Sequence, residues 1–137
     1  MEKLFDKEFV DKLFAEAADS PRLRQNHDLR NSAEDTSQRM LNALMPNTIV
    51  PIHQHIETAE TVICLCGKLE EILYERVEMT NEDGTTEETF KETVRYMLCP
   101  ELRAYGMQIP AGVWHTVNVI EPSVIFEAKD GAYVSAK

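Results

Sequence analysis

The chain has 137 residues, a formal net charge of -10 and 43% hydrophobic residues. This length and composition are typical of one globular domain with its own core. The acidic charge argues against a nucleic acid or an anionic membrane surface as partner. The longest apolar run, Val62 to Cys66, is far too short to span a bilayer. An odd count of three cysteines favours reduced thiols and a cytoplasmic location.

The first periodic segment, residues 4–19, is predicted to be a helix because its apolar residues recur about every four positions. Asp6 is expected to cap the start of this helix, and Ser20-Pro21 to end it. Residues 21–36 are polar and show no steady period. We therefore expect a surface connector there.

From residue 37 onward the apolar residues alternate as they do in strands. Short extended segments, Thr48–His53 among them, are separated by turn signals at Pro46-Asn47, Gly67, Asn81–Gly84, Pro110–Gly112 and Glu121-Pro122. Many short strands with regular turns are typical of an all-β barrel or sandwich. We expect one domain over 1–137, with a helix and connector over 1–36 and a barrel over 37–137.

Four residues with metal-binding side chains are predicted to converge inside this barrel. Side chains two apart on a strand point to the same face, so His53 and His55 face one spot. Glu60 follows after a segment long enough to turn, and His115 follows the tight turn Pro110-Ala-Gly112. Three imidazoles and one carboxylate leave open coordination positions for a ligand. Such donors accept zinc, iron, manganese or nickel, so we expect one divalent metal ion of open identity.

Two motifs carry a family resemblance. The spacing His53-x-His55-x-x-x-x-Glu60-x-x-x-x-x-x-Gly67 resembles the first motif of the cupin superfamily, and Pro110-Ala-Gly112-Val-Trp-His115 resembles the core of the second. With the segments Ser20–Asn26, Gln38–Leu44 and Phe126–Tyr133, the chain resembles the WbuC-type cupin-fold metalloproteins of bacterial surface-polysaccharide (O-antigen) gene clusters. The resemblance implies a cupin double-stranded β-helix (a jelly-roll barrel) with an N-terminal α-helix and one metal ion.

Further residues are candidates for the site. Asn42 lies on an apolar strand, where a buried amide needs a partner in the backbone or in a ligand. Glu127 lies in an apolar run; pointing inward it would be the catalytic general base, and pointing outward it would form a surface salt bridge. Arg24, Asn26 and Asn42 are the candidate substrate-binding residues, and Arg22, Arg24 and Arg30 could together bind an anion or simply be solvated.

Strand alternation also predicts which side chains face outward. Counted from Glu60, the side chains of Val62, Cys64 and Cys66 should point into the barrel, while those of Ile63 and Leu65 point out. Two such apolar side chains need a cover, either the N-terminal helix or a second subunit. We therefore expect a homodimer.

Three functions are compatible with these residues. The first is a metal-binding cupin that acts on or binds a sugar or nucleotide-sugar, as an isomerase or epimerase would. The second is a mononuclear iron dioxygenase, and the third is a non-catalytic sugar-binding or regulatory protein. A general base in a polar pocket favours the first, an apolar pocket the second, and a blocked metal position the third. Sequence alone leaves open whether the protein is an enzyme.

Overall fold

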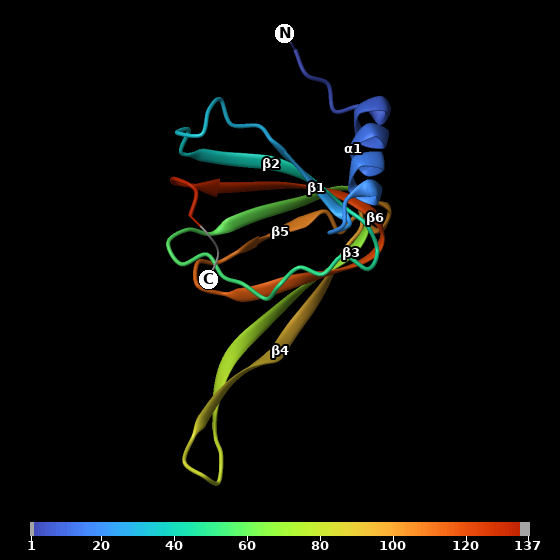
Figure 1. Cartoon of the computed structure of the whole chain (residues 1–137). Helices are drawn as coiled ribbons and strands as arrows, with labels where there is room; N and C mark the ends of the chain where they lie inside the picture. The colour runs from blue at the N-terminus through green and yellow to red at the C-terminus, as the bar shows by residue number, and fades with distance from the viewer. Residues whose placement is uncertain (1, 135–137) are drawn as a thin grey trace.

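A computed structural model describes residues 2–134 of the chain. It contains the helix α1 (Lys7–Asp19), the strands β1 (Arg24–Asp28), β2 (Ser37–Leu44), β3 (Glu60–Thr80), β4 (Thr86–Leu98), β5 (Gly106–Ile109) and β6 (Trp114–Asp130), and the short 3-10 helix η1 (Pro100–Leu102). The strands form an antiparallel sheet in the order β1-β2-β6-β3-β4, and β5 pairs with β3. The sheet curls into a barrel with α1 on one side (Figure 1), so the predicted β fold with one N-terminal helix is confirmed.

Helix α1 begins and ends where the sequence predicts. The Asp6 carboxylate accepts a hydrogen bond of 3.0 Å from the Phe9 N–H, and the helix is capped at its other end by Ser20. Leu13 and Ala17 are buried against the apolar residues that β2 and β6 turn toward the helix. Within the described part of the chain, every helix is too short or too polar to cross a membrane.

The predicted boundary between connector and barrel is wrong. Arg24–Asp28 forms β1, which pairs with β2 so that Asn26 lies opposite Asn42. The strand was missed because it is polar on both faces and therefore lacks the alternation that marks a half-buried strand. The segment Thr48–His53, conversely, is no regular strand, and only His53 forms a bridge, to His115.

Strands β3 and β6 run through the predicted breaks at Gly67 and Glu121-Pro122. The first part of β3 pairs with the last part of β6, and beyond Gly67 the pairing continues to the first part of β6. The register shifts between Cys64 and Leu69, where the chain forms bulges. Gly67 has a φ of 95°, and an added Cβ would lie 2.2 Å from the Pro122 carbonyl oxygen. Glycine is therefore required where the two strands bend together.

The bulge changes which side chains face the interior. Val62 and Cys64 are 1% and 2% exposed and belong to the interior core, as predicted. The prediction for Cys66 is wrong, because its side chain packs with the cluster under α1. Leu65 is 43% exposed. The helix packs on β1 and β2 and does not provide the expected cover for Leu65.

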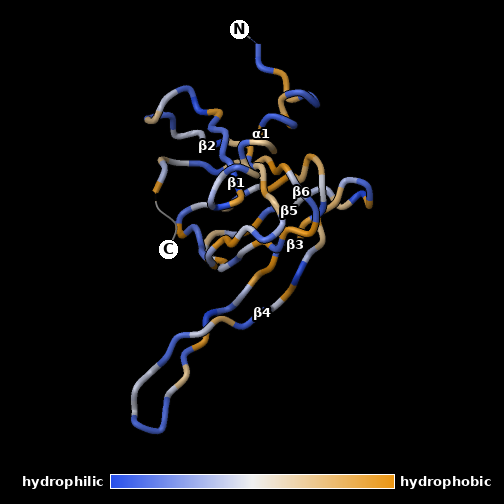
Figure 2. The backbone as a smooth tube through the Cα atoms, turned by 45° about the vertical axis from the view of Figure 1, so that its right-hand side comes forward, coloured by the Kyte–Doolittle hydropathy of each residue, from blue (hydrophilic) through white to orange (hydrophobic). Residues whose placement is uncertain are grey.

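The outer parts of β3 and β4 leave the barrel as a two-stranded arm (Figure 1). Its tip is the predicted turn at Asn81–Gly84, closed by a hydrogen bond of 3.0 Å from the Gly84 N–H to the Asn81 carbonyl. Figure 2 shows that hydrophilic residues prevail toward the tip. At its base the rings of Tyr74, Phe90 and Trp114 pack together, which anchors the arm to β6.

Candidate metal centre

The structure brings His53, His55, Glu60 and His115 together. One potential ligand atom from each residue lies within 4.8 Å of those of the other three. Glu60 is the first residue of β3 and His115 the second of β6, while the other two histidines lie on the segment that precedes β3. Backbone hydrogen bonds of 3.0 and 2.8 Å join His53 and His115, and the Gly112 N–H donates to the His55 carbonyl at 2.7 Å.

The hydrogen bonds of two histidine rings fix which nitrogen faces the cluster. Nδ1 lies 2.8 Å from the Pro51 carbonyl oxygen in His53 and 2.9 Å from that of Val113 in His115. A carbonyl only accepts, so each Nδ1 carries the proton and each Nε2 presents a lone pair. Backbone carbonyls orient metal-binding histidines in the same way.

Two buried atoms of the cluster lack a hydrogen-bond partner. They are Nε2 of His115 and Oε2 of Glu60, which lie 3.4 Å apart without forming a hydrogen bond. Oε2 is also 3.0 Å from Nε2 of His55. Two unprotonated acceptors at this distance repel each other unless a cation lies between them. The donor set therefore fits a divalent metal ion.

The charge states also suit a metal. Burial lowers the pKa of His53 to about 4, which keeps its imidazole neutral at physiological pH. Burial alone would raise the pKa of Glu60. Hydrogen bonds from the adjacent His115 and His55 rings in their protonated forms, and the charge of the Lys129 ammonium, outweigh burial and hold that pKa below its ordinary value. A neutral imidazole and an ionised carboxylate are the forms that bind metal ions.

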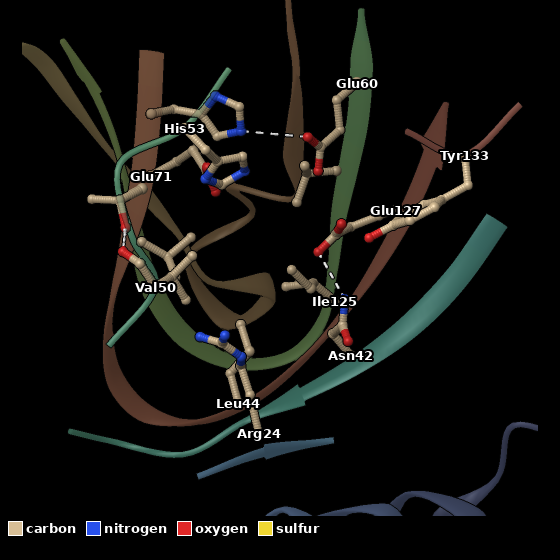
Figure 3. Close-up of a pocket in the computed structure, with 14 residues that line it drawn as sticks. Arg24, Asn42, Leu44, Val50, His53, Glu60, Glu71, Ile125, Glu127 and Tyr133 are labelled. Atoms are coloured by element: carbon tan, nitrogen blue, oxygen red, sulfur yellow. Dashed lines mark hydrogen bonds and ion pairs between the residues drawn. The ribbon is translucent and has the colours of Figure 1, made fainter. Parts of the chain in front are cut away.

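A cavity of about 310 Å³ adjoins the cluster (Figure 3). Besides His53, Glu60 and His115, its lining includes the polar residues Arg24, Asn42, Glu71, Thr116, Glu127 and Tyr133 and the apolar residues Leu44, Val50, Val62, Val117 and Ile125. The cavity is therefore polar well beyond the candidate metal ligands. A ligand with several hydroxyl groups would find partners there.

Glu127 faces this cavity and not the outer surface. Its side chain is 16% exposed, and its Oε1 accepts a hydrogen bond of 3.0 Å from the Asn42 amide. Its Oε2 lies 3.9 Å from the Lys129 ammonium. Burial, with the nearby charge of Glu60, raises the pKa of Glu127 to about 8. This carboxyl therefore exchanges its proton near neutral pH.

The candidate substrate-binding residues differ in position. Asn42 lines the cavity, whereas Asn26 is exposed and donates to the Asn42 side-chain oxygen at 3.0 Å. Arg24 lines the cavity and donates to the Ile49 carbonyl at 2.8 Å.

The combined binding of an anion by three arginines is not supported. Arg30 pairs with Asp28 at 2.8 Å, and neither Arg30 nor Arg22 lines the cavity. Arg24 alone of the three arginines is in position to contact a ligand.

Sequence reasoning missed Glu71 and Lys129. Glu71 is 2% exposed and lines the cavity, but strand alternation counted from Glu60 would point it outward, because the intervening bulge is invisible in the sequence. Lys129 is two residues beyond Glu127 on β6, and its side chain is only 10% exposed. The same alternation that applies to Glu127 could have found it.

The fold and the site together define a protein of cupin fold with a candidate centre of three histidines and one glutamate. The chain belongs to the family described as a domain of unknown function (DUF6016), whose pattern matches residues 5–89. No curated protein matches the sequence. The narrower resemblance to WbuC-type proteins remains a prediction.

Three solved structures illustrate the likeness. CapF, a capsular polysaccharide assembling protein from Staphylococcus aureus, has a TM-score of 0.59 at 16% identity, with 84% of this chain and 30% of that chain covered. Oxalate oxidase in complex with the substrate analogue glycolate has a TM-score of 0.56 at 12% identity, with 88% of this chain and 57% of that chain covered. Oxalate decarboxylase from Bacillus subtilis, a protein with Mn(II) centres, has a TM-score of 0.53 at 20% identity, with 83% of this chain and 27% of that chain covered. This chain thus spans 27% to 57% of their lengths, and these identities show the fold alone.

Proposed function

We propose that this protein is a metal-dependent enzyme that acts on a sugar or nucleotide-sugar in surface-polysaccharide metabolism, as an isomerase or epimerase. The observation that carries the proposal is Glu127, a buried carboxyl that faces a polar cavity beside the four candidate metal ligands. The WbuC-type resemblance and the role of the structurally similar CapF in capsular polysaccharide assembly support the substrate class.

The four ligands would hold one divalent ion, which when bound polarises a substrate carbonyl and stabilises the negative charge that develops on its oxygen. In an isomerase, Glu127 would remove the proton from the hydroxyl-bearing carbon next to that carbonyl and return it to the carbonyl carbon, while the hydroxyl proton passes to the former carbonyl oxygen. In an epimerase, the proton would return to the other face of the carbon from which it was removed. A pKa of about 8 allows this carboxyl to accept and release a proton near neutral pH. Asn42 orients Oε1 for this transfer, and Lys129 stabilises the ionised form.

The polar lining of the cavity favours the proposal over one of its two alternatives, the iron dioxygenase. An iron dioxygenase was expected to have an apolar cavity, but Arg24, Asn42, Glu71 and Glu127 all line this one. A non-catalytic sugar-binding protein would use the same polar lining without moving a proton. Proton exchange between substrate and solvent therefore distinguishes an enzyme from a binding protein.

The experiment measures that exchange. The protein, loaded with Mn²⁺ or Zn²⁺, is incubated in D₂O with a panel of aldoses, ketoses and nucleotide-sugars, and ¹H NMR follows the C–H signal next to the carbonyl. We expect this signal to disappear for at least one sugar, and Glu127→Gln to slow the loss by roughly 100-fold or more while full metal content is kept. Glu121→Gln, which removes an exposed carboxylate from the same strand, is the matched control. Absence of exchange with every sugar in the fully loaded protein would overturn the proposal.

A further inference from the structure

Glu71 is a buried carboxyl for which the metal centre has no evident use. It lies on β3 between Val117 of β6 and Tyr96 of β4, and its residue is 2% exposed. Its Oε2 is buried and has no hydrogen-bond partner among the described residues. A buried oxygen without a partner is destabilising, so a group of this kind in a native protein calls for a partner from outside the chain.

The cavity is where that partner would lie. Glu71 lines the same cavity as His53 and Glu127, and Figure 3 shows Glu71 and Glu127 on opposite sides of it. Glu71 is not one of the four residues whose ligand atoms cluster around the candidate metal position. A ligand that occupies the cavity would therefore lie next to the Glu71 side chain.

The surroundings of Glu71 determine what kind of ligand group it accepts. Burial, and then the charges of Glu60 and Glu127, raise its pKa well above the ordinary value. A protonated carboxyl offers one O–H donor and one carbonyl acceptor, which matches a hydroxyl or a carbonyl group.

We propose that Glu71 is a specificity-determining residue that forms a hydrogen bond with a neutral hydroxyl or carbonyl oxygen of the sugar bound in the cavity. This assignment rests on the proposed function, because it takes the ligand to be a sugar. Glu71 then contacts the bound sugar from the side opposite Glu127 and fixes which group of the sugar faces the general base.

Binding of neutral hexoses and their uridine diphosphate conjugates to the metal-loaded protein tests the assignment by calorimetry. Glu71→Leu should weaken binding of the sugar that binds the wild type by about tenfold or more, the loss expected for one buried hydrogen bond. Glu71→Gln keeps a donor and an acceptor and should stay within about threefold of the wild type. Glu78→Leu removes an exposed carboxylate from the outer part of the same strand and is the matched control.

Metal content and thermal unfolding confirm that each variant is folded and loaded. Glu71→Met, which is unbranched and adapts to irregular space, replaces Glu71→Leu should the latter fail to fold. Wild-type affinity in the folded apolar variant would refute the role of Glu71 and leave the proposed function standing. Failure of every sugar to bind the loaded wild type would remove the proposed function and the role of Glu71 together.

Discussion

Replacing Gly67 with alanine tests whether the shared bend of β3 and β6 determines the stability of the barrel. Gly67 has a φ of 95°, a conformation that costs a residue with a Cβ about 1–2 kcal/mol. The new Cβ would also lie 2.2 Å from the Pro122 carbonyl oxygen and 2.6 Å from the Ser123 Cα. Both atoms belong to the backbone, so the β6 strand itself must move.

The expected loss of stability has two parts. Overpacking of a tight site typically costs about 1–3 kcal/mol, which adds to the cost of the positive φ for a total of about 2–5 kcal/mol. Gly84 provides the control, because its φ is 86° and an added Cβ would have no atom within 4 Å. Gly84→Ala should therefore cost only the first part, about 1–2 kcal/mol.

Urea denaturation of the metal-free wild type and both variants, followed by circular dichroism, measures the free energy of unfolding. We expect Gly67→Ala to unfold at a clearly lower urea midpoint than Gly84→Ala. The dependence of the free energy of unfolding on urea concentration should be similar for all three proteins. Equal losses in the two variants would show that β6 yields at no cost. The bend would then be a soft connection and not the constraint that its geometry indicates.

Three further predictions concern the metal centre and the subunit arrangement. His53→Ala and His115→Ala should each abolish stoichiometric metal, measured by elemental analysis, while circular dichroism still reports a β protein; full metal content in both variants would falsify the ligand assignment. In the metal-free protein, the unfolded chain releases the Glu127 proton above about pH 4.5, whereas the native state holds it to about pH 8. The native state therefore binds more protons at Glu127 in this window. This one group should make the free energy of unfolding fall with rising pH by at most about 1.4 kcal/mol per unit, a contribution that Glu127→Gln should remove in urea titrations at several pH values. The exposed Leu65 leads us to expect a homodimer in analytical ultracentrifugation, which Leu65→Asp should weaken; a wild-type monomer at all concentrations would contradict this.

The sequence predicts the metal cluster well because its pattern depends on short-range geometry. His53 and His55 are two residues apart, and Glu60 opens the next strand. The tight turn before His115 positions that residue in the same way. The relations among His53, His55 and Glu60 hold within a few residues, where alternation and turn chemistry are reliable. That His115 joins them from far along the chain was implied by the resemblance of the two segments to the two cupin motifs.

Features that depend on long-range pairing were not predictable in the same way. The bulges between Cys64 and Leu69 shift the alternation, so Cys66 turns toward α1 and Glu71 enters the cavity. We predicted the end of a strand at Gly67 because glycine is common in turns. Its role in the structure is to let the β6 backbone approach β3 closely. The polar segment β1 forms a strand because it pairs with the edge of β2, and the local sequence pattern does not reveal this partner.

The main-chain links between the histidines imply that metal exchange does not require unfolding. His53 and His115 are joined by two backbone hydrogen bonds, and Gly112 holds the His55 carbonyl. These bonds join main-chain atoms and do not use the donor atoms of the side chains, so we expect most of the conformational entropy of gathering the donors to be lost during folding. In a zinc finger, by contrast, the metal-free chain is unfolded and binding drives folding. We therefore expect an ion bound at this centre to exchange while the barrel stays folded.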